Sequence, residues 1–257
     1  MVINAMQKRG QATVFAILGI VILIIVALFF LLRNEFGFFV SPTSFLGDKA
    51  KPIEDNLKDC VSNALKDSLD IFGKQSGYFA PANYLLYQDM HVKYYCLNIP
   101  NKESCLNVMP TLSELIDNLN NRIEGNVNNC VDKDLIKSGL GYEIKAGRVS
   151  TNILTSDTGI TVKAHYDVKI TKGENSYTVR DAAINYDAPI KSIYSVAVDA
   201  VNSESRVGFF EQLLYMLDKK GQFVINLDKP YPDKVYKIQK KDSSFEFWFA
   251  IEGERNI

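Results

Sequence analysis

The first 33 residues are dominated by one uninterrupted hydrophobic run. Residues 10–32 carry no charge and are almost all apolar, and they directly follow the basic pair Lys8 and Arg9. About 20 apolar residues in a helix are enough to cross a hydrocarbon layer of roughly 30 Å. A helix also satisfies its own backbone hydrogen bonds there. The run therefore predicts a transmembrane helix over 11–33, with the lipid bilayer as its partner.

The charges that flank this run predict its orientation. Lys8 and Arg9 precede it, whereas Arg33 and Glu35 nearly cancel on the other side. The positive-inside rule then predicts a single-pass protein of the cell membrane, with a cytoplasmic N-terminus and an extracytoplasmic C-terminal domain. A buried core helix and a cleavable secretory signal are the alternatives. Secretory signals have a shorter apolar region of about 7–15 residues that ends in a small-residue site, so a retained anchor is favoured.

After the run the pattern becomes amphipathic. Residues 34–50 mix Gly, Pro and Ser and are typical of a stalk. From Pro52 to Phe72 apolar residues recur every three or four positions, which predicts a helix. A second helix begins at Thr111, where Thr111 and Glu114 form a capping box. These two helices and the loops between them predict a helical, disulfide-containing subdomain over 51–132.

Beyond residue 139 the hydrophobic period changes from about 3.6 to 2. Between Ile160 and Ile170 every even-numbered residue is apolar and every odd-numbered one is polar, as in a half-buried strand of an antiparallel sheet. Residues 171–176 read as a hairpin turn. Shorter strand patterns occupy 142–146, 150–154, 177–180, 223–227, 235–238 and 245–251, and helical stripes occupy 190–201 and 209–217. The region 133–257 therefore predicts helices packed on an antiparallel sheet, an α+β fold.

Four cysteines lie in the first half of the region after the apolar run. An even number of cysteines in an exported domain is typical of disulfides, and four permit three pairings. We favour Cys96–Cys105, which closes a short polar loop, and Cys60–Cys130, which ties the two helices together. Free thiols and a metal site are the alternatives, and zinc sites usually show closely spaced ligand pairs.

Composition and motifs favour a protein without catalytic chemistry. Charged residues make up 23% of the chain and the formal net charge is −1, so a basic face for nucleic acid is not expected. The two histidines, His91 and His165, are read as solvent-facing, and the carboxylate pairs Asp55/Asp59 and Glu252/Glu254 as solvated. Six aromatic residues between 78 and 95 form either a recognition surface or, as we favour, packing contacts. No enzymatic activity, metal or cofactor is predicted.

The residues around the start of the apolar run carry one resemblance. The segment Lys8-Arg9-Gly10-Gln11-Ala12-Thr13-Val14 resembles the class III signal of type IV pilin-like proteins, a group that includes archaeal pilins, archaellins and Tad-type pseudopilins. The resemblance implies a leader over 1–10 that a prepilin-type peptidase removes between Gly10 and Gln11. It also implies an envelope protein, archaeal or bacterial, whose partners are other pilin-like subunits.

One position departs from that family pattern. The family usually has Glu at the fifth mature position, where this chain has Phe15. Two functions follow from the sequence. The first is a pilin-like, membrane-anchored extracytoplasmic envelope protein that serves as a filament or pseudopilus subunit. The alternative is a single-pass adhesion or ligand-binding ectodomain that does not polymerise, and Phe15 favours it. An enzyme with an unrecognised site is the third hypothesis.

Overall fold

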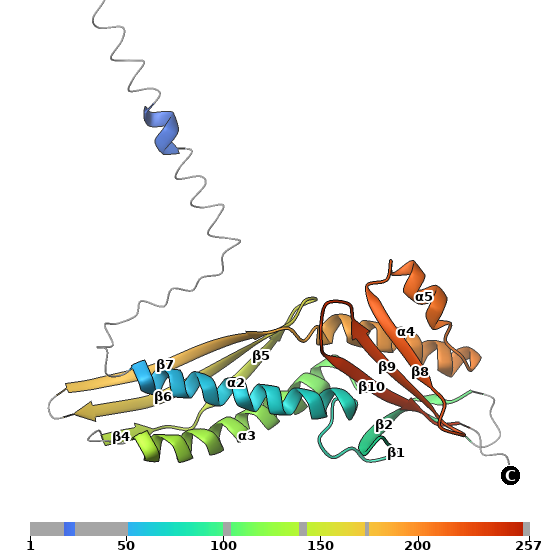
Figure 1. The fold of residues 1–257 in the computed structure, drawn as a ribbon, viewed down its shortest axis with the longest axis horizontal. Coiled ribbons are helices and arrows are strands. Elements are labelled where there is room, and N and C mark those ends of the chain that lie inside the picture. The colour runs from blue at the N-terminus through green and yellow to red at the C-terminus, as the bar shows by residue number, and fades with distance from the viewer. Residues whose placement is uncertain (1–17, 24–50, 100–103, 139–142, 173–174, 254–257) are drawn as a thin grey trace, which may run out of the picture. The chain divides into compact units, whose positions relative to one another are not determined.

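The structure is a computed structural model that describes residues 18–23, 51–99, 104–138, 143–172 and 175–253 (Figure 1). The chain separates into two units, Met1–Leu46 and Gly47–Ile257. Among the described residues, all the strands and helices α2 to α5 belong to the second unit.

The predicted membrane anchor is not supported. Among the described residues, none of the helices combines the length and the apolar character needed to span a bilayer. In the segment 11–33 the structure describes residues 18–23, which are helical. This finding contradicts both the transmembrane helix over 11–33 and the single-pass location in the cell membrane. The rest of that segment, the leader 1–10 and the stalk 34–50 lie outside the described residues.

Two long helices lie side by side in the second unit (Figure 1). Helix α2 spans Lys51–Lys74 and α3 spans Leu112–Ser138. The predicted apolar stripe of α2, from Ile53 to Phe72, is buried. Apolar residues spaced by three and four lie on one face of a helix, and packing that face against the core removes them from water. Helix α3 continues through the Asn-rich residues 126–129 to Ser138. Val127 and Val131 extend its buried face there.

A four-stranded antiparallel sheet packs against the first half of α2 and the second half of α3 (Figure 1). Its strands are β4 Glu143–Ala146, β5 Ser150–Thr155, β6 Ile160–Lys172 and β7 Asn175–Tyr186. Strand β7 pairs with one edge of β6. On the other edge, β5 pairs with the first half of β6 and β4 with the second half. Along β6 the even-numbered residues from Ile160 to Ile170 are buried, which confirms the predicted alternation. The Tyr166 hydroxyl donates a hydrogen bond to the Leu57 carbonyl of α2, 3.2 Å away.

A second sheet has six strands and combines distant parts of the chain. Its order is β1-β2-β10-β9-β8, with β3 paired to β2. The strands are β1 Tyr84–Tyr87, β2 Met90–Leu97, β3 Leu106–Asn107, β8 Phe223–Asp228, β9 Lys234–Lys240 and β10 Glu246–Ile251. Strand β10 runs parallel to β2, so this sheet is mixed rather than antiparallel as predicted. Strand β2 of the segment 51–132 and strand β10 of the segment 133–257 are neighbours in this sheet.

Three aromatic rings form a ladder across the centre of this sheet. Tyr95 of β2, Phe249 of β10 and Tyr236 of β9 are stacked, with ring centroids 5.3 and 5.2 Å apart. All three are fully buried. Aromatic pairs on neighbouring strands are among the stronger cross-strand contacts in sheets. The ladder therefore specifies the pairing of β2, β10 and β9, which is non-local in sequence.

Two helices complete the unit beside this sheet. Helix α4, Ile190–Val207, buries its predicted stripe against β9, β2 and β10. The short helix α5, Gln212–Asp218, contacts β8. Its predicted core stripe is wrong, because Leu213, Leu214 and Leu217 are exposed. Tyr215 and Met216 pack against the core instead.

Gly73 allows α2 to approach β10 closely, and it supplies a first prediction. A Cβ on Gly73 would lie 2.1 Å from the Glu246 carbonyl oxygen. In an open helix, alanine is favoured over glycine by about 1 kcal/mol. Overpacking costs about 1–3 kcal/mol, and this contact is with backbone, which cannot move alone. We expect Gly73→Ala to lower the free energy of unfolding by about 2 kcal/mol, measured by urea denaturation.

Gly125 in α3 is the matched control for that substitution. A Cβ there meets no atom within 4 Å, so Gly125→Ala should raise the free energy of unfolding by about 1 kcal/mol. If both variants become more stable, the close approach of α2 to β10 is contradicted.

Candidate functional site

The residues predicted for the N-terminal signal and for the disulfides have different outcomes. Gly10 and Gln11 lie outside the described residues. Cys60 is bonded to Cys130 with a Cα–Cα distance of 5.8 Å, and Cys96 to Cys105 at 5.4 Å. These are the two pairs that the sequence predicted. The first joins α2 to α3, and the second joins β2 to the segment that leads into β3.

The two histidines lie far from each other in the fold. His165 on β6 pairs with Asp181 on β7, with Nδ1 2.6 Å from Oδ1, and both side chains are about two-thirds exposed. His91 on β2 is exposed and its ring lies 4.1 Å from that of Tyr84. Within the described ranges, no group of three or more potential metal ligands forms. Ser150 of β5 lies opposite His165 across the strand pair, while the hydrogen-bond partner of the His165 ring is the Asp181 carboxylate.

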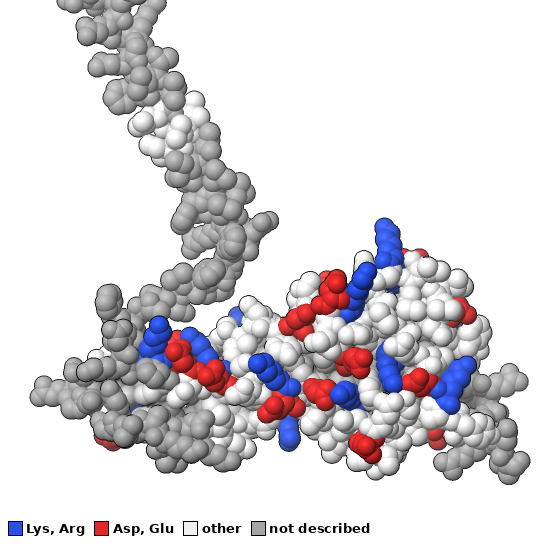
Figure 2. Space-filling model, in the orientation of Figure 1, with Lys and Arg blue, Asp and Glu red and all other residues white. Residues whose placement is uncertain are grey.

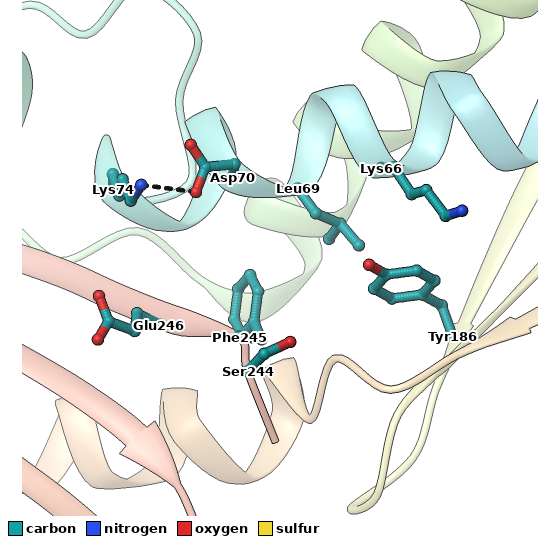
Figure 3. Close-up of a pocket in the computed structure, with 8 residues that line it drawn as sticks. All are labelled: Lys66, Leu69, Asp70, Lys74, Tyr186, Ser244, Phe245 and Glu246. Atoms are coloured by element: carbon teal, nitrogen blue, oxygen red, sulfur yellow. Dashed lines mark ion pairs between the residues drawn. The ribbon is translucent and has the colours of Figure 1, made fainter.

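A cleft of about 220 Å³ lies between α2 and the start of β10 (Figure 3). Three elements meet there, namely the second half of α2, the end of β7 and the start of β10. The residues that line it are Lys66, Leu69, Asp70, Lys74, Tyr186, Ser244, Phe245 and Glu246.

Apolar and charged groups are separated within the cleft. Leu69 and Phe245, each less than a tenth exposed, form its apolar floor. Tyr186 and Lys66 lie at one end, and Glu246 lies at the other (Figure 3). At the Glu246 end Lys74 pairs with Asp70, with Nζ 2.7 Å from Oδ1 (Figure 3). One end of the apolar floor thus carries the cation Lys66, and the other carries two acids and one lysine, which suits a small molecule that carries both charges.

A cation–aromatic cluster lies next to the cleft on the six-stranded sheet. The Lys237 ammonium is 5.0 Å from the centre of the Tyr87 ring and 4.9 Å from that of Trp248. Lys237 also pairs with Asp228 at 2.6 Å, and the Tyr87 hydroxyl donates to the same carboxylate at 2.6 Å. The hydrogen bonds from Lys237 and Tyr87 hold the pKa of Asp228 below its ordinary value.

The cleft and this cluster share two charged side chains. Lys74 lies 5.9 Å from the centre of the Trp248 ring, and the Trp248 indole N–H donates to Glu246 at 3.1 Å. Figure 2 shows the result as alternating positive and negative groups across this face. No sequence motif predicted this arrangement, because its members come from β1, α2, β8, β9 and β10. The one signal was the aromatic segment 78–95, of which Tyr87 joins the cluster while Tyr95 packs in the core.

The ion pair of Asp228 leads to a pH prediction. Because the folded state lowers the pKa of Asp228, its contribution to stability is present above the ordinary aspartate pKa of about 4 and is lost as the pH falls through the lower, folded value. We expect the stability of Asp228→Asn to fall less than that of the natural chain as the pH is lowered. Thermal unfolding from neutral pH to about pH 2 measures this difference. Asp181→Asn, at an exposed pair, is the control, and equal acid profiles for both variants would contradict the prediction.

Comparisons of this chain with protein-family models, with curated proteins and with solved structures found no match. The function therefore has to be argued from the chain itself.

Proposed function

We propose that this chain is a pilin-like subunit of a protein assembly rather than an enzyme. The observation that carries the proposal is the segment Lys8–Val14, a basic leader ending in Gly10 before an apolar run. Two features support it. An α+β unit that begins at Gly47 follows the run, and two disulfides stabilise that unit, as expected of a protein that works in an oxidising environment.

The mature N-terminus tests this proposal. Protein isolated from its native cells should begin at Gln11 by intact-mass analysis and N-terminal sequencing. Gly10→Leu should leave the leader attached, because a bulky side chain at the scissile position obstructs a peptidase that accepts glycine. Electron microscopy with an antibody to the chain should then show it in filaments. A chain that keeps Met1, or one that begins elsewhere, would exclude a pilin-type leader.

A second function, binding of a small zwitterion, is favoured by the cleft between α2 and β10. Its charged ends and apolar floor suit a short peptide with a free ammonium and a free carboxylate. Glycylglycine is the probe, and chemical-shift changes in the full chain are the measurement. Changes should centre on the cleft residues and disappear in Lys66→Ala, whereas Lys163→Ala, on exposed β6, should retain them. Shifts that are absent, or that Lys66→Ala leaves unchanged, would exclude this function.

A further inference from the structure

The side of α5 that faces away from the sheet, the end of α4 and the loop between the two helices expose apolar residues. Five side chains there, between 58% and 74% exposed, form what we call the α5 apolar surface: Val207, Phe209, Leu213, Leu214 and Leu217. Leu217 follows Leu214 by three residues and Leu213 by four, so the three leucines lie on one face of the helix. Figure 2 shows a mostly uncharged surface over this part of the fold.

Contacts on the opposite side hold α5 in this orientation. The Tyr215 hydroxyl donates to Asp199 of α4 at 2.7 Å, and the Tyr215 ring lies 5.1 Å from that of Phe210. The Met216 sulfur accepts the Ile225 N–H of β8 at 3.2 Å. Helix α5 is thus fixed by its inner side, and its leucines cannot turn inward without breaking these contacts.

The loop that precedes α5 is also held in place. Gly208 adopts a left-handed conformation with φ of 77° and ends α4. Its carbonyl accepts a hydrogen bond from Lys234 at 2.7 Å, and the Phe209 carbonyl accepts one from Ser203 at 2.7 Å. The exposure of Phe209 is therefore a defined feature of the fold.

The size of the surface is that of an interface. Five side chains of this size, each more than half exposed, present an apolar area on the order of 600 Å², the upper end of the largest patch on typical monomers. A stable interface takes about 800 Å² from each partner, including its polar rim. The α5 apolar surface and the charged groups that border it are large enough to supply that area.

The charges at the two ends of α5 identify the partner. Glu211 immediately precedes the helix, and Lys219 and Lys220 follow it. If two copies of α5 pack antiparallel, each Glu211 faces the lysines of the other copy. This is the self-complementarity that an interface about a two-fold axis requires. We infer that a second copy of this chain docks on the α5 apolar surface, with the two α5 helices antiparallel. This contact closes on itself, so it does not depend on the proposed filament function.

The experiment compares the full chain with charged variants at the leucines. Multi-angle light scattering after size-exclusion chromatography should show an assembly whose mass halves in Leu214→Glu. Leu86→Glu is the matched control, because Leu86 on β1 is 64% exposed and far from α5 in the chain. It should leave the mass unchanged. Circular dichroism and thermal unfolding establish that both variants fold.

Cross-linking then tests the geometry. Isotopically labelled and unlabelled chains are mixed and treated with a carbodiimide, which joins carboxylates to amines at zero length. Links between Glu211 of one chain and Lys219 or Lys220 of the other are expected, and Leu214→Glu should abolish them. The inference is overturned by a natural chain that stays monomeric, by an assembly that survives Leu214→Glu, or by links that occur only within one chain. An assembly of the natural chain through the apolar residues 10–32 is recognised by its survival in Leu214→Glu.

Discussion

Replacing both Cys60 and Cys130 by alanine should lower the free energy of unfolding by about 4 kcal/mol. The disulfide closes a loop with a sequence separation of 70 residues, and the chain-entropy model gives about 4 kcal/mol for a loop of this length. Domains are stable by only about 5–15 kcal/mol, so this bond carries a large part of the total. The buried contacts between α2 and α3, which include Leu65, Leu115 and Leu119, should still allow the double variant to fold.

The second disulfide provides the comparison. Cys96 and Cys105 are separated by 9 residues, for which the same model gives about 3 kcal/mol. Thermal and urea unfolding of the two double-alanine variants should therefore show that the variant lacking Cys60 and Cys130 is the more destabilised. At roughly 2–4 °C per kcal/mol for a unit of this size, its Tm should fall by about 10 °C. The opposite ranking would show that local packing, rather than loop closure, sets the contribution of each bond.

Glu204→Ala should be the most destabilising substitution of a polar residue, at about 3 kcal/mol. Glu204 of α4 is 2% exposed, and its carboxylate accepts hydrogen bonds from Lys234 at 2.6 Å and from the Tyr236 hydroxyl. Removing one partner of a buried ion pair costs about 3–5 kcal/mol, because the remaining charge stays buried without an opposite charge. Lys234 is 26% exposed and regains some water, which places the expected value at the lower end. Tyr236 is fully buried and keeps an unpaired hydroxyl.

One further variant separates the lost charge from the lost side chain, and a second variant is the control. Glu204→Gln keeps an acceptor for the Tyr236 hydroxyl and should cost less than Glu204→Ala. Asp117→Ala, at an exposed acid of α3, should change the free energy of unfolding by less than about 0.5 kcal/mol. If Glu204→Ala behaves like Asp117→Ala in urea denaturation, the link from α4 to β9 contributes little to stability.

The local elements of this protein could be predicted because their hydrophobic periods are strong. The stripe from Ile53 to Phe72 predicted α2, and the alternation from Ile160 to Ile170 predicted β6. Both patterns arise from burial of one face, which depends on the element's own sequence. The prediction of a membrane-spanning helix over 11–33 was wrong, because none of the helices in the described part of the chain is long and apolar enough to cross a membrane.

The candidate sites could not be predicted in this way. Lys237, Tyr87 and Trp248 are brought together by strand pairing between β1, β2, β10 and β9, and no spacing along the chain reports such a contact. Likewise, the leucines of α5 have the pattern of a core stripe. Their exposure depends on Tyr215 and Met216 occupying the side that faces α4 and β8.

The sequence by itself determined that the chain is α+β and where α2 and β6 lie, because both follow from local periodicity. It favoured one of three cysteine pairings, and the structure contains that pairing. The tertiary structure alone decided that β2 runs parallel to β10, that Gly73 brings α2 onto that strand, and which face of α5 is left to solvent. These features depend on contacts between residues far apart in the chain, whose free energy exists only once the whole unit has folded.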